Sequence, residues 1–177
     1  GAGGGVGLTA VEIGAALGAR VIAVARGPEK LQVCKARGAA ITIDSAKEDV
    51  VATVKALGGV DVVYDPVGGE SFVAALKCCR PEARYLVIGF ASGDVPQIKA
   101  NHLLVKNVDV LGFYWGGYMS FAPQVLHNSL TEVFAMIAKG LLTPHIGGSY
   151  DFDQALEALD DLKARKSIGK LVVRGPV

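Results

Sequence analysis

The stretch GAGGGVGLTAVEIGAALGARVIAVARGPEK, residues 1–30, decides the fold class of this sequence. Its glycine cluster runs directly into an apolar-periodic segment at 7–17, and a run rich in Val and Ile follows at 21–25. Glycines at the start of a helix let backbone N–H groups approach an anion, and the helix N-terminus adds a positive partial charge. A dinucleotide-binding turn requires this order of turn, helix and strand. We therefore expect a nucleotide-binding unit at the beginning of the sequence.

The register of the glycines departs slightly from the dinucleotide-binding pattern. Read as G-x-G-x-x-G ending at Gly7, the three glycine positions fall on Ala2, Gly4 and Gly7. The first glycine is thus an alanine. A glycine cluster alone is a weak signal, and the simpler alternative is a tight turn that binds nothing; the helix and strand that follow favour the nucleotide.

The rest of the chain alternates strand-like and helical patterns. Apolar runs predict strands at 21–25, 40–43, 60–65, 84–90 and 108–115, and apolar-periodic segments predict helices at 7–17, 29–37, 48–57, 70–79 and 101–106. Nearly continuous apolar strands separated by helices indicate a parallel sheet covered on both faces. We expect a doubly wound, Rossmann-type α/β domain.

Such a sheet has a central first strand that should precede Gly1, and the sequence contains none. We expect this sequence to be a piece of a longer polypeptide. A longer helix is predicted at 123–139, a turn-rich connection at 144–150, an amphipathic helix at 151–165 and a final strand at 170–174.

Composition excludes several classes of function. The 177 residues are 51% apolar, and 18 Lys and Arg against 17 Asp and Glu leave a net charge of +1. No block of like charge is present, so we expect no nucleic-acid partner. Residues 110–131 lack Asp, Glu, Lys and Arg, but glycine, proline and polar residues interrupt them, so we expect no membrane span.

The cysteines and histidines do not form a metal-binding pattern. Cys34, Cys78 and Cys79 have no ligand spacing, and the three histidines are scattered, so we expect no metal site. The cysteines are interpreted as reduced thiols of an intracellular protein, in the cytoplasm or the mitochondrial matrix.

The residues after the 21–25 strand indicate which dinucleotide is bound. An Asp or Glu at its end would hold an adenosine 2′-hydroxyl and favour NAD. The sequence has Ala25 and Arg26 there, then Lys30, so a 2′-phosphate would meet two cations and no carboxylate. We expect Arg26 and Lys30 to select NADP(H); the alternative is that both are solvated surface residues.

Five motifs in order, namely residues 1–31, VDVVYDPVGGESF, RYLVIGFASGDVP, NVDVLGFYWGGY and RKSIGKLVV, extend over essentially the whole chain. Together they resemble the zeta-crystallin-like quinone oxidoreductases of the medium-chain dehydrogenase/reductase superfamily. The resemblance implies an NADPH-dependent, zinc-independent reductase of quinones or α,β-unsaturated carbonyls. It further implies that residues 1–142 are the NADP(H)-binding domain and that residues 143–177 return to a GroES-like catalytic domain absent from this sequence.

Coenzyme-binding positions follow from the resemblance residue by residue. Those on the phosphate side are Gly4, Gly5, Val6 and Gly7 at the pyrophosphate, with Lys30, Ser45 and Arg165 near the 2′-phosphate. Ser45 stands where the family commonly has Tyr or His and cannot cover the adenosine. Val67 and Gly68 would border the adenosine or the nicotinamide ribose, and Gly89, Phe90, Phe113 and Tyr114 would contact the nicotinamide side. No catalytic residue is assigned, because proton delivery and acceptor placement would belong to the absent domain.

Aromatic side chains cluster after the last predicted sheet strand. The segment 113–121 holds Phe113, Tyr114, Trp115, Tyr118 and Phe121. It can be a homodimer interface along the 108–115 edge, part of the core or a wall of the acceptor site; we favour the interface, which the resemblance also implies. Asp65, just before Pro66, is expected to cap a turn.

The rival hypothesis from another class is a non-catalytic module that binds NADP(H) as a sensor or assembles as a dimer scaffold. An intact catalytic domain upstream would favour the enzyme.

Overall fold

The computed structural model describes residues 1–176 and divides the chain into two compact units. Unit 1 contains residues 1–46 and 136–177, and unit 2 contains residues 47–135. This division differs from the predicted boundary after residue 142, because the chain from Met136 onward packs with residues 1–46. The assignment of residues 143–177 to a separate catalytic domain stays a prediction.

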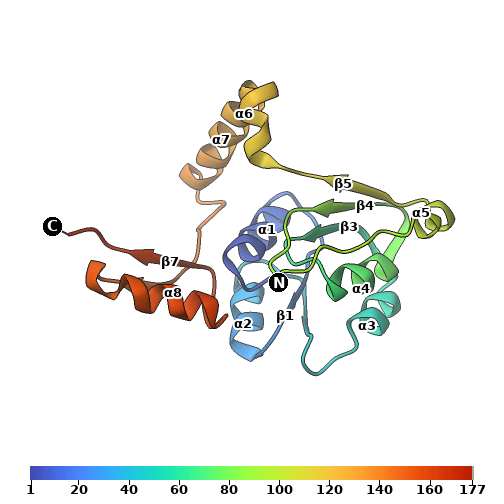
Figure 1. Cartoon of the computed structure of the whole chain (residues 1–177), viewed down its shortest axis with the longest axis horizontal. Helices are drawn as coiled ribbons and strands as arrows, with labels where there is room; N and C mark the ends of the chain where they lie inside the picture. Colours follow the sequence, from blue (N-terminus) through green and yellow to red (C-terminus); the bar gives the residue numbers. More distant parts are fainter. Residues whose placement is uncertain (177) are drawn as a thin grey trace. The chain divides into compact units, whose positions relative to one another are not determined.

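Unit 1 begins with the expected turn, helix and strand. Its first part consists of α1 (Gly5–Ala16), β1 (Ile22–Ala25), α2 (Pro28–Ala36) and β2 (Ile41–Asp44) (Figure 1). β1 and β2 pair in parallel, from Ile22 opposite Ile41 to Ala25 opposite Asp44. Leu8, Val11, Ala23, Cys34 and Ala39 form the buried core beneath α1 and α2.

The second part of unit 1 contains a strand that the sequence did not predict. It consists of β6 (Ile146–Tyr150), the short 3-10 turn η2 (Phe152–Gln154), α8 (Ala155–Lys163) and β7 (Lys170–Val173). β6 pairs in parallel with β7, so the expectation of a mere turn-rich connection at 144–150 was wrong. The Gly-Gly-Ser centre of β6 lacks the apolar alternation that identifies a strand, and only pairing with β7 reveals it.

Unit 2 is a three-stranded parallel sheet with helices. Its strands are β3 (Val60–Asp65), β4 (Cys79–Val87) and β5 (Asp109–Gly112), in the order β3-β4-β5. Its other elements are α3 (Val50–Ala56), α4 (Glu70–Cys78), α5 (Ala100–Lys106), η1 (Trp115–Gly117), α6 (Tyr118–Phe121) and most of α7 (Pro123–Ala138). β4 begins five residues earlier than predicted.

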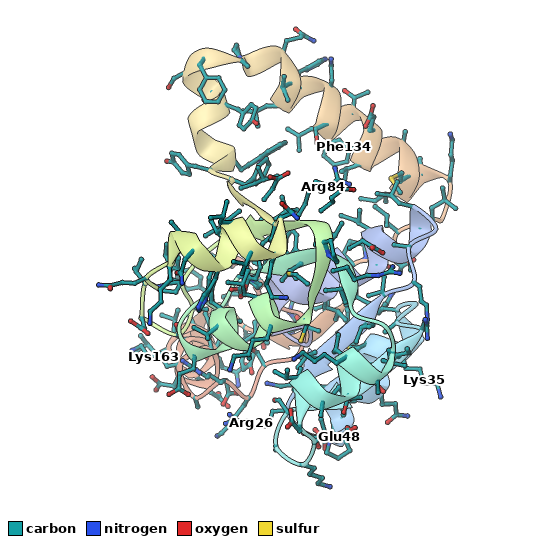
Figure 2. The ribbon with its side chains drawn as sticks, turned by 90° about the vertical axis from the view of Figure 1, so that its right-hand side faces the viewer. Arg26, Lys35, Glu48, Arg84, Phe134 and Lys163 are labelled. Atoms are coloured by element: carbon teal, nitrogen blue, oxygen red, sulfur yellow. The ribbon has the colours of Figure 1, made fainter. Side chains whose placement is uncertain are left out.

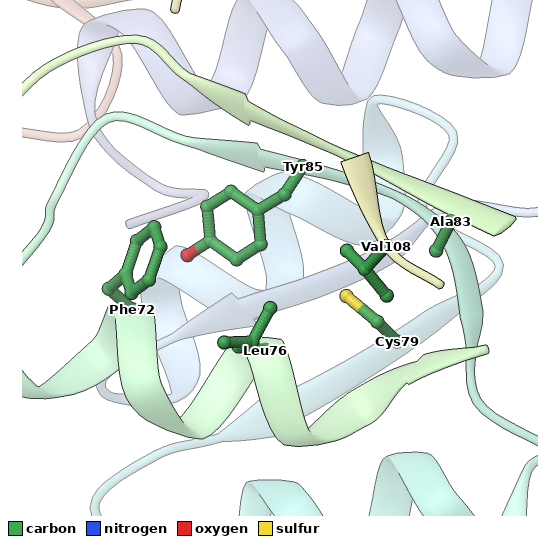
Figure 3. Close-up of a cluster of buried hydrophobic side chains, with 6 residues drawn as sticks. All are labelled: Phe72, Leu76, Cys79, Ala83, Tyr85 and Val108. Carbon is green, nitrogen blue, oxygen red and sulfur yellow. The ribbon is translucent and has the colours of Figure 1, made fainter. Parts of the chain in front are cut away.

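The core of unit 2 lies between α4 and the sheet (Figure 3). Phe72 and Leu76 of α4 contact Tyr85 of β4, and Cys79, Ala83 and Val108 complete the cluster. Phe72 and Tyr85 are almost completely buried, and their ring centroids lie 4.4 Å apart. Burial of such side chains contributes roughly 1.5–3 kcal/mol each to folding.

The predicted α/β class is confirmed, with helices alternating with parallel strands throughout the described residues. Within those residues, β1 pairs only with β2, and β3 pairs only with β4. The backbone N–H of Ala2 donates to the carbonyl of Val24 in β1 at 3.0 Å. The start of the glycine stretch therefore lies beside β1, on the side away from β2.

Candidate dinucleotide-binding site

The glycine turn of unit 1 leaves the N-terminus of α1 without a cap. Gly4 is the N-cap residue, no side chain caps the helix and its first turn contains no acidic residue. Among residues 1–176, the backbone N–H groups of Gly5, Val6 and Gly7 have no backbone acceptor outside α1. The first N–H groups of a helix need partners from outside it, and an anion satisfies them well.

The glycines of the turn differ in what they permit. A Cβ atom at Gly7 would lie 2.2 Å from the carbonyl oxygen of Gly1. Only glycine at position 7 therefore lets the backbone of Gly1 lie so close to α1. A Cβ atom at Gly4 would meet only that same oxygen at 3.6 Å, an ordinary contact. Gly7 therefore permits close packing of the chain, whereas Gly4 lies on the open side of the turn.

Lys30 of α2 lies across this turn. A Cβ atom at Gly3 would come within 2.8 Å of the Lys30 Cβ atom, so the lysine stem lies directly against the glycine backbone. The Lys30 Nζ atom donates to the carbonyl oxygen of Arg165 at 2.6 Å. Two residues predicted near the 2′-phosphate, 135 positions apart, are thus brought together beside the predicted pyrophosphate turn.

The loop between α8 and β7 closes against the same turn. The N–H of Gly169 donates to the carbonyl of Gly3 at 2.9 Å, and Gly4 and Gly169 form a parallel bridge. A Cβ atom at Gly5 would lie 2.8 Å from the Cδ atom of Lys170. Lys170 was not predicted from the sequence. Only the folded chain, in which Gly169 bridges to Gly4, brings Lys170 beside the start of α1.

Arg26 and Ser45 lie in the loops that follow β1 and β2. Arg26 is exposed and extends from the ribbon (Figure 2), and Ser45 is exposed as well. Backbone N–H and side-chain hydroxyl of Ser45 both donate to the carbonyl of Ala25, at 3.0 and 3.4 Å. The buried Asp44 carboxylate accepts the Gly27 N–H at 3.2 Å, so the two loops are tied together.

Unit 2 brings its six candidate residues to one edge of one sheet. The strands pair so that Asp65 lies opposite Val87, and Val87 opposite Gly112. The loops after β3, β4 and β5 therefore leave the sheet side by side at its carboxyl ends, where ligands bind in open α/β sheets. They contain the pairs Val67 and Gly68, Gly89 and Phe90, and Phe113 and Tyr114.

Two of these loops are bound to each other. The N–H and hydroxyl of Ser92 donate to the carbonyl of Val67 at 2.9 and 2.7 Å. A Cβ atom at Gly68 would lie 2.9 Å from the Phe90 ring, so glycine permits the ring to approach. Phe90 and Phe113 are 42% and 40% exposed and Tyr114 is 79% exposed, which leaves their faces open to a ligand.

The candidate residues thus form two sets, one on each unit. Unit 1 contains the glycine turn, Arg26, Lys30, Ser45 and Arg165, and unit 2 contains the six residues of the sheet edge. The first set presents amides and cations, and the second presents aromatic and glycine surfaces.

No metal site accompanies them in the described residues: no three His, Cys, Asp or Glu side chains of residues 1–176 are grouped so that they could hold an ion. In the same part of the chain, no helix is both long and apolar enough to cross a membrane.

The turn, the parallel strands and the crossover helices define a Rossmann-type dinucleotide-binding domain. The family model described as "Zinc-binding dehydrogenase" matches residues 5–135. The chain belongs to this family, and the predicted resemblance to quinone oxidoreductases of the medium-chain dehydrogenase/reductase superfamily is confirmed.

Individual relatives support this assignment. A "Quinone oxidoreductase-like protein 2 homolog" of Nematostella vectensis is 39% identical over 97% of the chain and 48% of its own length. A quinone oxidoreductase structure from Pseudomonas syringae has a TM-score of 0.87 and 34% identity over 97% of this chain and 54% of that one. An Escherichia coli quinone oxidoreductase complexed with NADPH has a TM-score of 0.87 and 28% identity over 98% and 55%. The chain spans about half the length of the curated relatives it matches.

Proposed function

We propose that this chain is the NADP(H)-binding part of a zinc-independent oxidoreductase that reduces a quinone or an α,β-unsaturated carbonyl. The uncapped start of α1, with Lys30 lying across the glycine turn, is the observation that carries the proposal. The complex of the E. coli relative with NADPH supports the choice of coenzyme.

The residues of unit 1 fit the charged half of the coenzyme. The N–H groups of Gly5, Val6 and Gly7 would hold the pyrophosphate, aided by the helix dipole. Arg26, Lys30 and Arg165 would hold the 2′-phosphate, with a hydrogen bond from the Ser45 hydroxyl.

The residues of unit 2 fit the uncharged half. Val67 and Gly68 would border a ribose, and the edges formed by Phe90, Phe113 and Tyr114 would lie beside the nicotinamide. NADPH, when bound, supplies the hydride that the acceptor takes up with a proton. The protein orients the coenzyme, and the remainder of the parent polypeptide would place the acceptor.

Zinc independence is part of the proposal, although the family is named for zinc. The described residues offer no ligand group, and hydride transfer to an electron-poor C=C bond needs no metal on this chain. Addition of zinc is expected to leave NADPH binding unchanged in calorimetry; a zinc-dependent gain in affinity would contradict this part.

The coenzyme assignment is tested by calorimetric titration with NADPH and NADH at fixed salt. We expect a preference for NADPH, which Arg26→Asp and Lys30→Ala each reduce by about tenfold or more, because a charge-assisted hydrogen bond is worth roughly 1.5–3 kcal/mol. Arg20→Asp and Lys35→Ala are matched controls. Lys35 is exposed on the same helix as Lys30 (Figure 2), and neither control side chain is expected to reach the turn.

A folded chain that binds neither coenzyme would show that the glycine turn is purely structural. Equal affinity for NADPH and NADH would contradict only the proposed selection of the 2′-phosphate by Arg26 and Lys30, and not dinucleotide binding by the turn.

The enzymatic half of the proposal concerns the parent protein. The isolated chain is expected to have negligible turnover with NADPH and a benzoquinone, and the parent protein to reduce it. A parent that binds NADPH but reduces neither quinone nor enone would favour the alternative, a sensor or dimer scaffold.

We also propose that the protein forms a homodimer along the 108–115 edge. Among the described residues β5 pairs only with β4, and Leu111 in this strand and Phe113 and Tyr114 just after it are exposed. Their exposure in this chain disfavours the core alternative for the aromatic cluster. An unpaired apolar edge invites strand pairing. Sedimentation should show a dimer that Leu111→Lys dissociates; a monomer at all concentrations would contradict it.

An intracellular location, in the cytoplasm or the mitochondrial matrix, is proposed as well. The three cysteines are buried free thiols, which is typical of reducing compartments.

A further inference from the structure

Asp65, the last residue of β3, is a buried carboxylate that the coenzyme assignment does not use. Its side chain accepts the N–H of Val67 at 2.8 Å and the N–H of Gly68 at 3.2 Å. It also accepts the hydroxyl of Tyr85 at 2.8 Å. Asp65 is only 8% exposed, and no Lys or Arg forms an ion pair with it among residues 1–176. Hydrogen bonds alone therefore compensate its burial.

These bonds determine the conformation of the loop after β3. Because both N–H groups turn inward to one carboxylate, the backbone between Val67 and Gly69 has little freedom left. Gly68 and Gly69 have φ angles of 71° and 58°, the left-handed region that other residues rarely adopt. Glycine adopts this region without strain, and the carboxylate selects it from the several conformations open to these two residues.

Tyr85 holds the Asp65 carboxylate from the core side of the loop. Its ring is fully buried against Phe72 of α4, and its hydroxyl points toward the end of α4 where Phe72 lies (Figure 3). Burial, and then the hydrogen bond to Asp65, raise the pKa of Tyr85 far above its usual range, so the hydroxyl remains a donor. The core of unit 2 is thus connected to the loop through one tyrosine and one aspartate.

The loop after β3 is hydrogen-bonded to the loop after β4. Ser92 bonds the carbonyl of Val67, and the N–H of Gly69 donates to the carbonyl of Asp94 at 3.1 Å. Phe90 lies against Gly68. A change at Asp65 therefore alters the position of Phe90 as well as that of Val67.

We propose that Asp65, supported by Tyr85, is a positioning residue that sets the ribose and nicotinamide wall of the coenzyme site. This inference rests on the proposed function, because it takes Val67, Gly68 and Phe90 as that wall. Asp65 touches no ligand itself; it acts through the backbone of the two loops.

The test compares two ligands on the same chain. NADPH has a nicotinamide and its ribose, which adenosine 2′,5′-bisphosphate lacks, and the candidate residues for the phosphates of the bisphosphate all belong to unit 1. In Tyr85→Phe and Asp65→Asn, the dissociation constant for NADPH should rise roughly tenfold, because a loop that is in its binding conformation about a tenth of the time binds about tenfold more weakly. The constant for the bisphosphate should change by less than about twofold, since that ligand lacks the nicotinamide and the ribose that the proposed wall would hold.

Asp61→Asn is the matched control. It lies on the same strand, but its carboxylate is exposed and pairs with Arg80 at 3.0 Å, so both affinities should be unchanged. Tyr85→Phe keeps the packed ring and decides the question if Asp65→Asn does not fold.

Unchanged NADPH affinity in a folded Tyr85→Phe variant would overturn the inference. An equal loss for both ligands would do so too, because it would indicate general destabilisation. A wild-type chain that binds neither ligand would instead refute the proposed function.

Discussion

Gly4 and Gly7 belong to one turn but meet different constraints. At Gly7 the backbone of Gly1 leaves no room for a side chain, whereas at Gly4 the nearest atom allows a methyl group. A glycine motif read from sequence treats the two alike. Only the structure separates the glycine that the fold requires from the one that lies open to a ligand.

Gly7→Ala should lower the free energy of unfolding by about 1–3 kcal/mol, because the new Cβ atom would overlap a carbonyl oxygen. Gly4→Ala, the matched control, should change it by less than about 1 kcal/mol. Urea unfolding followed by circular dichroism measures both. Equal stabilities of the two variants would contradict the difference in packing.

Cys79 gives the protein a sensitivity to alkali. Burial raises the pKa of its thiol from 9.0 to about 11, against the opposing effect of Lys106. Between pH 9 and 11 the unfolded chain therefore releases a proton that the folded chain retains, and stability falls as pH rises. Cys79→Ala should reduce this fall by on the order of 2 kcal/mol. Unfolding free energies measured at pH 8, 9, 10 and 11 would show it, and an unchanged slope would count against it.

At the scale of elements, most of the fold could be predicted because its strands are apolar and its helices periodic. The strand β3 was predicted with its bounds, and β1 and β2 to within a residue at either end. β6 was missed because Gly147, Gly148 and Ser149 have no apolar pattern. It forms because β7, more than twenty residues away, supplies its hydrogen bonds.

The site was predictable to a different extent. The turn follows from local sequence, and the capping role of Asp65 was expected from its place before Pro66. The contact of Lys30 with Arg165 could come only from a resemblance, since 135 residues separate them. Tyr85 as partner of Asp65, and Lys170 over Gly5, depend on packing and carry no local signal.

The connection into β6 is attached to the first helix of unit 1 by Glu12. Its carboxylate accepts the N–H of Thr143 at 2.6 Å and pairs with Arg37, which also donates to the Thr143 carbonyl. Glu12→Ala should therefore release this connection while α1 persists.

Hydrogen exchange should show at least tenfold faster exchange over residues 143–150 in Glu12→Ala. Glu29→Ala, on the exposed side of α2, is the control and should leave that segment protected. Equal protection in both variants would argue that Glu12 is not the anchor.

At the scale of the whole molecule, the proposed coenzyme should stabilise the fold. NADPH at one hundred times its dissociation constant should stabilise the folded chain by about 2.7 kcal/mol, because it binds only the folded form. The same concentration of NADH should stabilise it less. Thermal unfolding with each coenzyme measures the difference, and identical shifts would contradict the preference for the 2′-phosphate.

The bridge between Gly4 and Gly169 has a consequence for biosynthesis. The turn is synthesised more than 150 residues before the loop that closes it, which contains Arg165 and is followed by Lys170. A chain that stops at residue 164 would have the glycines and α1 but not their cover. Coenzyme binding would then require synthesis to have passed Lys170, so that products truncated before it are left without the ligand that would stabilise them.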